Sequence, residues 1–311
     1  MKKLFASQIA HLSMKQPAYR KFVSELLEVL YKADVGSGDI TTALLGNSAR
    51  KMEAKITAKE NGILTGVEEA VWFLTKHGVK VKALVKDGGK VKKGKVFLEL
   101  SGSAKNILTV ERVVLNLLQR MSGIATAAHH VAKKIGVRKF AATRKTPWGL
   151  LDSKAVVVGG GLPHRLNLAD LILVKENHIR ADKNCWQKIK TTKSFEIEAD
   201  SEKLAIKIAE FFGKQKNLIL LLDNFSPKQL KKLIPKLRKI NPQITLEGSG
   251  GITPKHARKF LAAGVDYISM GYLTHSAKAL DLSLKIESNG FPYHRQRYRR
   301  INCSFEIERE R

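Results

Sequence analysis

Cysteine is almost absent from this chain, and its scarcity excludes a disulfide-stapled or cysteine-ligated architecture. Cys185 and Cys303 are the only two among 311 residues. Two cysteines so far apart form neither a disulfide framework nor a metal-binding spacing. We therefore expect a protein of a reducing cellular interior, which predicts a cytoplasmic location.

Long apolar runs are missing as well. No stretch approaches the roughly 20 apolar residues that a membrane-spanning helix needs. The first seven residues are basic, but an acid-bearing helical pattern follows them in place of the apolar core of a signal peptide. The sequence thus predicts no membrane segment.

Acidic and aromatic residues are few. Lys and Arg number 56 against 28 Asp and Glu, which gives a formal net charge of +28, and aromatics make up only 7%. So basic a chain invites a nucleic-acid interpretation, but stacking platforms are scarce and no zinc-finger or helix-turn-helix pattern is present. The charge is spread along the chain and mixed with glutamate, as in residues 201–212. Diffuse charge favours solubility or attraction of anionic substrates. A non-enzymatic nucleic-acid binder is the least favoured alternative.

What is present first is an N-terminal block of mixed structure. Apolar spacing predicts helices over residues 16–32 and 67–77, and alternation predicts strands over 51–64 and near 96–100. The glycine-punctuated pattern of residues 87–98 also occurs in biotinyl and lipoyl carrier domains. Because no lysine can be assigned to an exposed hairpin tip of its own, we favour a structural β-hammerhead.

Strands and helices alternate beyond a predicted helix over residues 110–119. Strands are expected at residues 140–143, 171–175, 195–200, 218–223, 244–247 and 267–271. Such alternation implies right-handed parallel connections. About six units fall short of a full eight-unit barrel of ~250 residues, so an incomplete, six-stranded α/β barrel is predicted. Residues 155–158 fit either a seventh strand or a helical turn.

Cationic side chains gather near the ends of these strands. They are Arg144, Lys145, His164, Arg165 and Lys175. Polar groups at the carboxyl ends of parallel strands point into a shared mouth. So many positive charges in one mouth indicate a ligand with several negative charges. A solvated basic surface is the alternative.

The last two strands end in small residues. Ser249, Gly250 and Gly251 close one, before a helix expected to open at Pro254, and Gly271 closes the next, shortly before His275. Glycines let a backbone approach an anion, and barrel enzymes bind phosphate after their last two strands. This arrangement predicts a phosphate site.

Carboxylates also occupy strand positions. Glu196 and Glu198 lie two apart and share a face that Asp200 continues, and Asp223 ends an apolar strand. Magnesium is usually held by one or two carboxylates together with substrate phosphates. The alternative is that these are surface acids paired with lysines, which is least favoured for Asp223.

Together these segments resemble quinolinate phosphoribosyltransferase, the carboxylating nicotinate-nucleotide pyrophosphorylase family, from about Gly36 to about Ile286. The motifs that carry the resemblance are residues 38–42, 111–126, 143–146, 164–165, 175–178, 196–198, 222–225, 249–251 and 271–276. The resemblance implies phosphoribosyl transfer to quinolinate with loss of CO2, an N-terminal α/β sandwich joined to the incomplete barrel, and a homodimer or hexamer.

The resemblance also implies roles for individual residues. Arg144, Lys145, His164, Arg165 and Lys175 would surround quinolinate, with Arg112 contributed by the neighbouring subunit. Glu198 and Asp223 would face the ribose and Mg²⁺ of phosphoribosyl pyrophosphate, and Ser249, Gly250, Gly251, Gly271 and His275 would bind its phosphates. Lys145, Lys175, Glu198 and Asp223 would be catalytic.

The resemblance implies three segments and leaves one substrate alternative open. The expected segments are residues 1–109 with 276–288 packed back on them, the barrel at 110–275, and a basic extension at 289–311, which lies outside the resemblance and is expected to be flexible. Thr146–Trp148, Leu162–Pro163 and Glu176 depart from the common family pattern. Leu162–Pro163 is similar to molybdenum-transport-associated homologues, so a same-fold enzyme acting on another base is the alternative.

Overall fold

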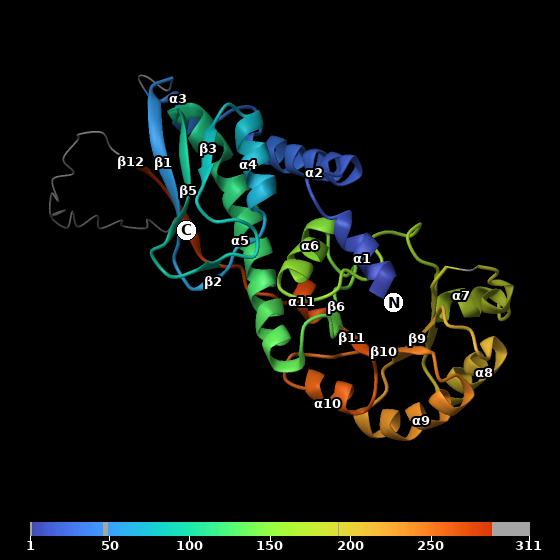
Figure 1. The fold of residues 1–311 in the computed structure, drawn as a ribbon. Helices are drawn as coiled ribbons and strands as arrows, with labels where there is room; N and C mark the ends of the chain where they lie inside the picture. The colour runs from blue at the N-terminus through green and yellow to red at the C-terminus, as the bar shows by residue number, and fades with distance from the viewer. Residues whose placement is uncertain (1, 46–48, 192, 288–311) are drawn as a thin grey trace, which may run out of the picture.

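The computed structural model describes residues 2–45, 49–191 and 193–287, arranged as a sandwich beside a barrel (Figure 1). The predicted extension at 289–311 lies outside the described residues. The predicted fold class, an α/β sandwich joined to an incomplete barrel, is confirmed.

An antiparallel sheet in the order β12-β1-β5-β3 forms the sandwich. Its strands are β1 (Lys51–Ala58), β3 (Lys80–Ala83), β5 (Val96–Ser103) and β12 (Leu282–Glu287). Alternation along β1 buries Ala54, Ile56 and Ala58 under α4 (Val67–Lys76) and α5 (Ala104–Ile135), and α2 (Pro17–Val35) packs on these helices. The short helix α3 (Ile40–Ala43) is capped by Asp39, which accepts from the Thr42 amide.

The segment with a carrier-like pattern, residues 87–98, contributes to two sheets. Its strand β4 (Lys90–Val91) pairs with β2 (Gly62–Ile63) in a separate two-stranded sheet, and the Lys93 amide donates to Asn61 Oδ1 at 2.9 Å. The segment is therefore tied to its neighbours, which fits the structural interpretation.

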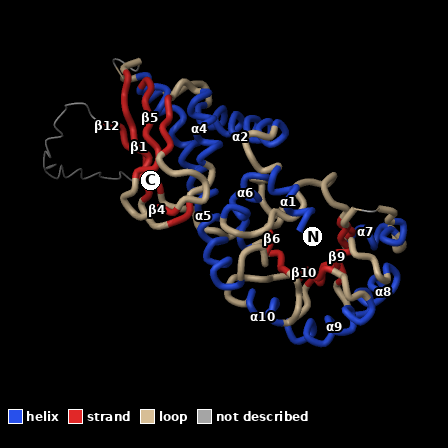
Figure 2. Tube along the Cα trace, viewed as in Figure 1, coloured by secondary structure: helices blue, strands red, loops and turns tan. Residues whose placement is uncertain are grey.

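All six strands predicted after the helix at residues 110–119 are present. They form one parallel sheet in the order β6-β11-β10-β9-β8-β7, and helices cover its outside (Figure 2). The strands are β6 (Phe140–Ala141), β7 (Leu173–Val174), β8 (Phe195–Ala199), β9 (Leu218–Asp223), β10 (Thr245–Ser249) and β11 (Tyr267–Ser269). The helices are α6 (Leu150–Val158), α7 (Glu176–Ala181), the 3-10 turn η1 (Cys185–Lys188), α8 (Glu202–Phe212), α9 (Pro227–Ile240), α10 (Ala257–Ala262) and α11 (Tyr272–His275).

Residues 155–158 are helical, because they form the end of α6. The gap between β6 and β7 is filled in two ways. Leu162 makes an isolated parallel bridge to Ala141, and the first helix, α1 (Lys2–Ala10), places Phe5 against Tyr267 and Ile219 inside the ring of strands. Phe5 and Leu162 thus help to fill the interior of the barrel.

The helix predicted over residues 110–119 is longer than expected and joins both parts of the fold. It is α5, which begins at Ala104. A helix over residues 110–119 would place Arg112 in its first turn, and this expectation is wrong. The returning chain presses on α5: a Cβ at Gly123 would lie 2.1 Å from the carbonyl oxygen of Lys278. After this contact the chain forms β12, which pairs with β1. The predicted division at 109/110 falls inside α5 and remains a prediction.

A buried ionic cluster fastens the sandwich to the barrel. Lys154 of α6 has a side chain only 7% exposed, and its Nζ lies 2.7 Å from Glu69, 3.0 Å from Glu68 and 3.0 Å from Asp87. Tyr19 of α2 also donates to Glu69 at 2.8 Å. Burial raises the pKa of Glu69, against the opposing charge of Lys154. Lys154 is therefore the counter-ion of the fully buried Glu69 and of the mostly buried Asp87, while Glu68 also reaches solvent.

Lys154→Met should destabilise the fold by about 3–5 kcal/mol, because it leaves buried carboxylates without a partner. Without Lys154 the folded-state pKa of Glu69 rises further above its unfolded value. A group with a raised folded pKa favours folding below its unfolded pKa, so the deficit should shrink as the pH falls from about 7.5 toward about 5. Thermal unfolding at both pH values checks this. Lys236→Met, which removes an exposed ion pair with Glu202, is the control and should change little. A deficit that grows at low pH would contradict the assignment.

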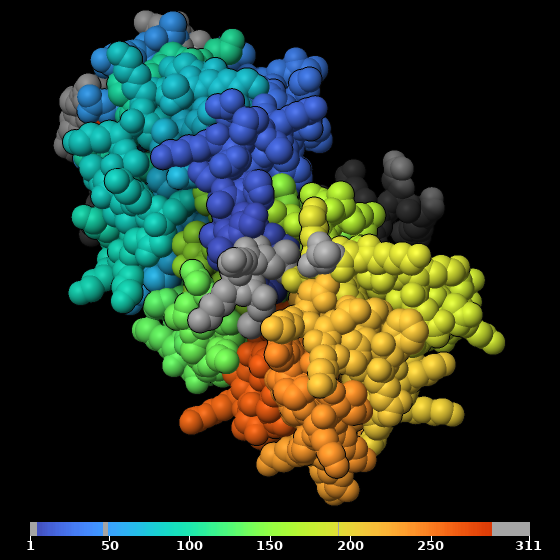
Figure 3. All heavy atoms as spheres, turned by 45° about the vertical axis from the view of Figure 1, so that its right-hand side comes forward, coloured from blue at the N-terminus to red at the C-terminus, as the bar shows by residue number. Residues whose placement is uncertain are grey.

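Figure 3 shows the sandwich, in blue to cyan, above the barrel, in green to orange. Within the described ranges, none of the helices is both long and apolar enough to cross a membrane.

Candidate active site

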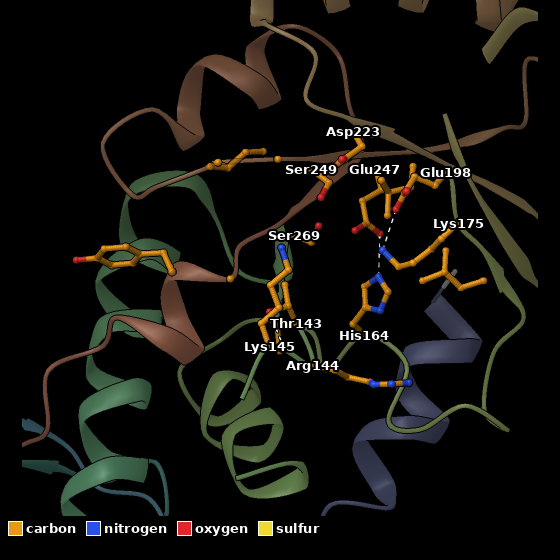
Figure 4. A pocket seen from close by; sticks show the side chains of 18 of the residues that line it. Thr143, Arg144, Lys145, His164, Lys175, Glu198, Asp223, Glu247, Ser249 and Ser269 are labelled. Atoms are coloured by element: carbon orange, nitrogen blue, oxygen red, sulfur yellow. Dashed lines mark hydrogen bonds and ion pairs between the residues drawn. The ribbon is translucent and has the colours of Figure 1, made fainter. Parts of the chain in front are cut away.

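A cavity of about 470 Å³ opens at the carboxyl ends of the barrel strands. Figure 4 shows Arg144 and Lys145 on the side opposite Asp223 and Ser249. Of the residues predicted for the site, those that line it are Arg144, Lys145, His164, Arg165, Lys175, Glu198, Asp223, Ser249, Gly250, Gly251, Gly271 and His275. Side chains up to 131 residues apart therefore meet because parallel strands end at one edge.

The loop after β6 presents Arg144 and Lys145. A network beneath it fixes its path: Arg120 of α5 donates from Nε to Asp152 at 2.9 Å and from Nη2 to the Thr274 carbonyl at 2.8 Å. Thr146 donates to the same Asp152 at 2.6 Å, and Asp152 is fully buried. The network joins α5, α6 and α11 to the loop, so the loop's cations are held on a rigid base.

The sequence predicted His164 and Arg165 near the end of a strand. In the structure both residues lie in the loop after α6. The preceding Leu162 is fixed to β6 by its bond to the Phe140 carbonyl at 2.8 Å. His164 then adopts a left-handed φ of 57°, and Arg165 enters the cavity. Burial, followed by the charge of Arg144, lowers the pKa of Arg165 from its usual value.

Lys175 follows β7 and meets a carboxylate across the cavity wall. Its Nζ donates to Glu198 Oε2 at 2.8 Å, and its backbone amide donates to His178 Nδ1 at 2.9 Å. Asp223 at the end of β9 accepts from Asn224 Nδ2 at 2.7 Å. Glu198 and Asp223 both line the cavity, and their oxygens are donors of the kind that magnesium prefers.

The glycine-ended strands meet the cavity as predicted. At Gly250, φ is 93°, and a Cβ would lie 2.6 Å from the Asn224 backbone nitrogen. Only glycine therefore fits between the ends of β9 and β10. The helix expected at Pro254 begins at Ala257 instead, because a turn closed by the His256 amide on the Thr253 carbonyl precedes it.

Two fully buried glutamates lie at the cavity floor. Glu196 and Glu247 each place Oε2 3.4 Å from Nε2 of His164, and the three groups are close enough to share a cation. Burial and the charge of Glu247 raise the pKa of Glu196 to about 7. Burial opposes a charge on His164, but the carboxylates outweigh it and raise its pKa well above 6.5. His164 thus supplies the positive charge itself.

Sequence reasoning gave Glu247 no role and Glu196 only a shared strand face. The signal for Glu247 is its position two residues before Ser249, which places it on the interior face of β10. The interpretation of Glu196 as a surface acid is wrong, because its side chain has no exposure.

Arg112 does not line the cavity. It lies exposed on α5, so a role in this site would require a second subunit.

Comparison with known proteins gives the family. Two family models cover most of the chain: the N-terminal domain of quinolinate phosphoribosyl transferase at residues 39–122 and its C-terminal domain at 124–285. A probable carboxylating nicotinate-nucleotide pyrophosphorylase of Methanothermobacter thermautotrophicus is 36% identical over 84% of this chain and 98% of that protein. A decarboxylating quinolinate phosphoribosyltransferase of Nicotiana glauca, described as mitochondrial, is 33% identical over 91% of this chain and 87% of that protein.

Solved structures agree. The nicotinate-nucleotide pyrophosphorylase of Ehrlichia chaffeensis superposes with a TM-score of 0.75 at 33% identity, covering 85% of this chain and 98% of that one. That of Francisella tularensis gives 0.74 at 31% identity, covering 86% and 96%. Sequence and structure therefore lead to one conclusion: this chain belongs to the quinolinate phosphoribosyl transferase family.

Proposed function

We propose that this protein transfers phosphoribosyl from phosphoribosyl pyrophosphate to quinolinate, releasing pyrophosphate and CO2 and forming nicotinate mononucleotide, a step of NAD biosynthesis. The observation that carries the proposal is the composition of one cavity. Cations surround its quinolinate side, while carboxylates and the glycine-ended strands β10 and β11 face them across it. This arrangement suits a dicarboxylate beside a phosphorylated sugar.

The first step forms the bond between the quinolinate ring nitrogen and the anomeric carbon as the bond from that carbon to pyrophosphate breaks. Lys145 and Lys175 stabilise the negative charge that develops on pyrophosphate, and the Glu198 carboxylate favours the positive charge on the ribose ring. The second step breaks the bond to the carboxylate beside the nitrogen. The pyridinium accepts its electron pair, CO2 leaves, and the ring carbon takes up a proton from water.

Glu198 and Asp223 are the residues that fit magnesium. Each presents carboxylate oxygens to the cavity, and the half-buried Asp223 side chain accepts a hydrogen bond from the amide of its neighbour Asn224. Mg²⁺ bound there with the substrate supplies charge neutralisation for the pyrophosphate group. The roles of this chain's own residues are to bind, orient and hold charge.

The departures from the family pattern support quinolinate over another base. Thr146, Trp148, Leu162, Pro163 and Glu176 do not line the cavity. Leu162 packs in the barrel interior, and Trp148 stacks beside Arg120. Differences at these positions therefore add no side chain to the substrate-facing wall.

The experiment is incubation with phosphoribosyl pyrophosphate, Mg²⁺ and quinolinate, followed by chromatography of the nucleotides. We expect nicotinate mononucleotide, and no product if either substrate is omitted. Failure to form it under conditions where the protein is folded would contradict the proposal. A cytoplasmic location is part of the same proposal.

We further propose a homodimer, or a hexamer built from it, in which Arg112 completes the site of the partner subunit. The support is that Arg112 is exposed on α5, while the cavity is lined without it.

Mixing inactive Arg112→Ala and Lys145→Ala proteins under subunit exchange should restore activity. A hybrid dimer holds one site with both residues intact, so up to about a quarter of wild-type turnover is expected from random exchange. Native mass spectrometry confirms that hybrids form. Hybrids that remain inactive would contradict a shared site.

A further inference from the structure

The buried pair Glu196 and Glu247 is an expensive feature of the barrel interior. Both side chains have no exposure, and within the described residues none of their carboxylate oxygens accepts a hydrogen bond of good geometry, although Ser269 and Tyr267 approach Glu247 and, against the effect of its burial, help to lower its pKa. An apolar pair of the same size would cost less there. Such a pair therefore needs a reason other than stability.

The pair lies one layer below the predicted substrate residues. Glu196 precedes Glu198 by two positions on β8, and Glu247 precedes Ser249 by two on β10. Side chains two apart on a strand share a face. Glu198 and Ser249 line the cavity wall, whereas Glu196 does not. Glu196 can therefore influence a ligand only through another side chain.

His164 is that side chain. It is the cation with which both glutamates form their ion pairs in the described part of the chain, at 3.4 Å each, and Figure 4 shows its ring directly beneath Glu247. The ring also lines the cavity. One imidazole thus connects the buried acids to the substrate space.

The backbone of His164 is in a conformation that needs support. A φ of 57° is uncommon for any residue other than glycine and carries a conformational cost. Hydrogen bonds fix the chain before and after His164. The Ala142 amide donates to the Leu162 carbonyl at 2.8 Å, and the Leu166 amide donates to Asp170 Oδ2 at 2.8 Å. Between these points the ion pairs of the ring hold the turn, and Arg165 leaves it toward the cavity.

We infer that Glu196, together with Glu247, is a positioning residue that holds the His164 ring and its left-handed turn, and thereby sets the placement of His164 and Arg165 against the carboxylates of quinolinate. This inference rests on the proposed function for the identity of the ligand. Glu196 touches no substrate. Its effect is expected on the base side of the cavity, because the His164 ring that Glu196 contacts belongs to the loop of His164 and Arg165, which carries none of the predicted phosphate-facing residues.

Glu196→Gln keeps the shape of the side chain and removes its charge. We expect the KM for quinolinate to rise roughly 10–100-fold, as a misplaced anchoring group allows, with the KM for phosphoribosyl pyrophosphate within about twofold of wild type. Glu198→Gln is the matched control: the same change two residues along the same face should lower kcat instead. Glu196→Asp, which retains the charge, should recover part of the quinolinate affinity.

A double-mutant cycle with His164→Asn tests whether Glu196 acts through His164. Asparagine tolerates the left-handed backbone and removes the ring. If His164 transmits the effect, adding Glu196→Gln to His164→Asn should raise the quinolinate KM no further. Full additivity of the two effects would overturn the inference, as would equal changes in both KM values.

A spectroscopic readout separates this inference from the proposed function. The ¹⁵N ring signals of His164, assigned by comparison with His164→Asn, should shift in Glu196→Gln without any substrate. If wild type fails to convert quinolinate but the signals shift, the proposed function fails and the positioning contact stands. Signals that do not move would overturn the contact itself.

Discussion

Lys175→Ala should reduce turnover at least about 10³-fold at every ionic strength. Lys175 lines the cavity, and its Nζ lies 2.8 Å from Glu198. Its charge therefore acts on bound substrate and not on the long-range attraction of substrate from solution. Removing a preorganised charge aimed at the departing group costs about 10²–10³-fold for one donor. Loss of Lys175 also leaves Glu198 without its partner, which increases the effect.

Steady-state kinetics at low and high salt measure this loss. Lys188→Ala is the matched control, because Lys188 also forms an ion pair with a carboxylate, Asp182, but this pair is exposed. We expect the turnover of this variant to stay near that of wild type. A Lys175→Ala protein that folds normally and turns over within tenfold of wild type would remove Lys175 from the reaction. If the difference in turnover between Lys175→Ala and wild type disappeared at high salt, Lys175 would act only by long-range electrostatic attraction of the substrate.

Nicotinate should be rejected by at least about 10³-fold in kcat/KM relative to quinolinate. Arg144, Arg165 and Lys175 line the base side of the cavity beside His164, which exceeds what one carboxylate needs. A ligand without the second carboxylate leaves partly desolvated cations unpaired, and sites built to bind a polar group reject analogues that lack it by about 10⁴–10⁵-fold. The burial that lowers the pKa of Arg165 adds to this cost.

Competition assays with the two acids, and with the isomeric pyridine dicarboxylates, check the rejection. Among these pyridine dicarboxylates, only quinolinate has one carboxylate on the carbon beside the ring nitrogen and the other on the next carbon. Efficient use of nicotinate with no use of quinolinate would contradict the assignment of the base and favour the same-fold alternative.

Much of the barrel was predictable because its strands are buried on both faces. Runs such as residues 218–222 read as uninterrupted apolar strands, and a polar residue at each run's end marks the mouth. The same logic located Asp223, Lys175 and the glycines of β10. It could not give the length of α5, because the apolar spacing that identifies that helix weakens at Ser122, which hydrogen-bonds the Thr65 backbone, and at Gly123, which packs against the returning chain.

Contacts across the interior were the part that sequence could not provide. The position of Glu247 two residues before Ser249 indicates its strand face, but its partner His164 is 83 positions away, so the pairing could not be predicted. Arg120 and Asp152, which support the loop of Arg144 and Lys145, likewise meet only in the folded chain. The helix expected at Pro254 begins later because a turn intervenes, and element boundaries of this kind depend on tertiary packing.

The central claim is that this cavity joins a ribose to quinolinate and then expels the carboxylate beside the new bond. Quinolinate labelled with ¹³C in its 2-carboxyl group tests it directly, with phosphoribosyl pyrophosphate and Mg²⁺ present. We predict that labelled CO2, pyrophosphate and unlabelled nicotinate mononucleotide appear in equal amounts. A nucleotide that retains the label, or pyrophosphate released without CO2, would contradict the claim.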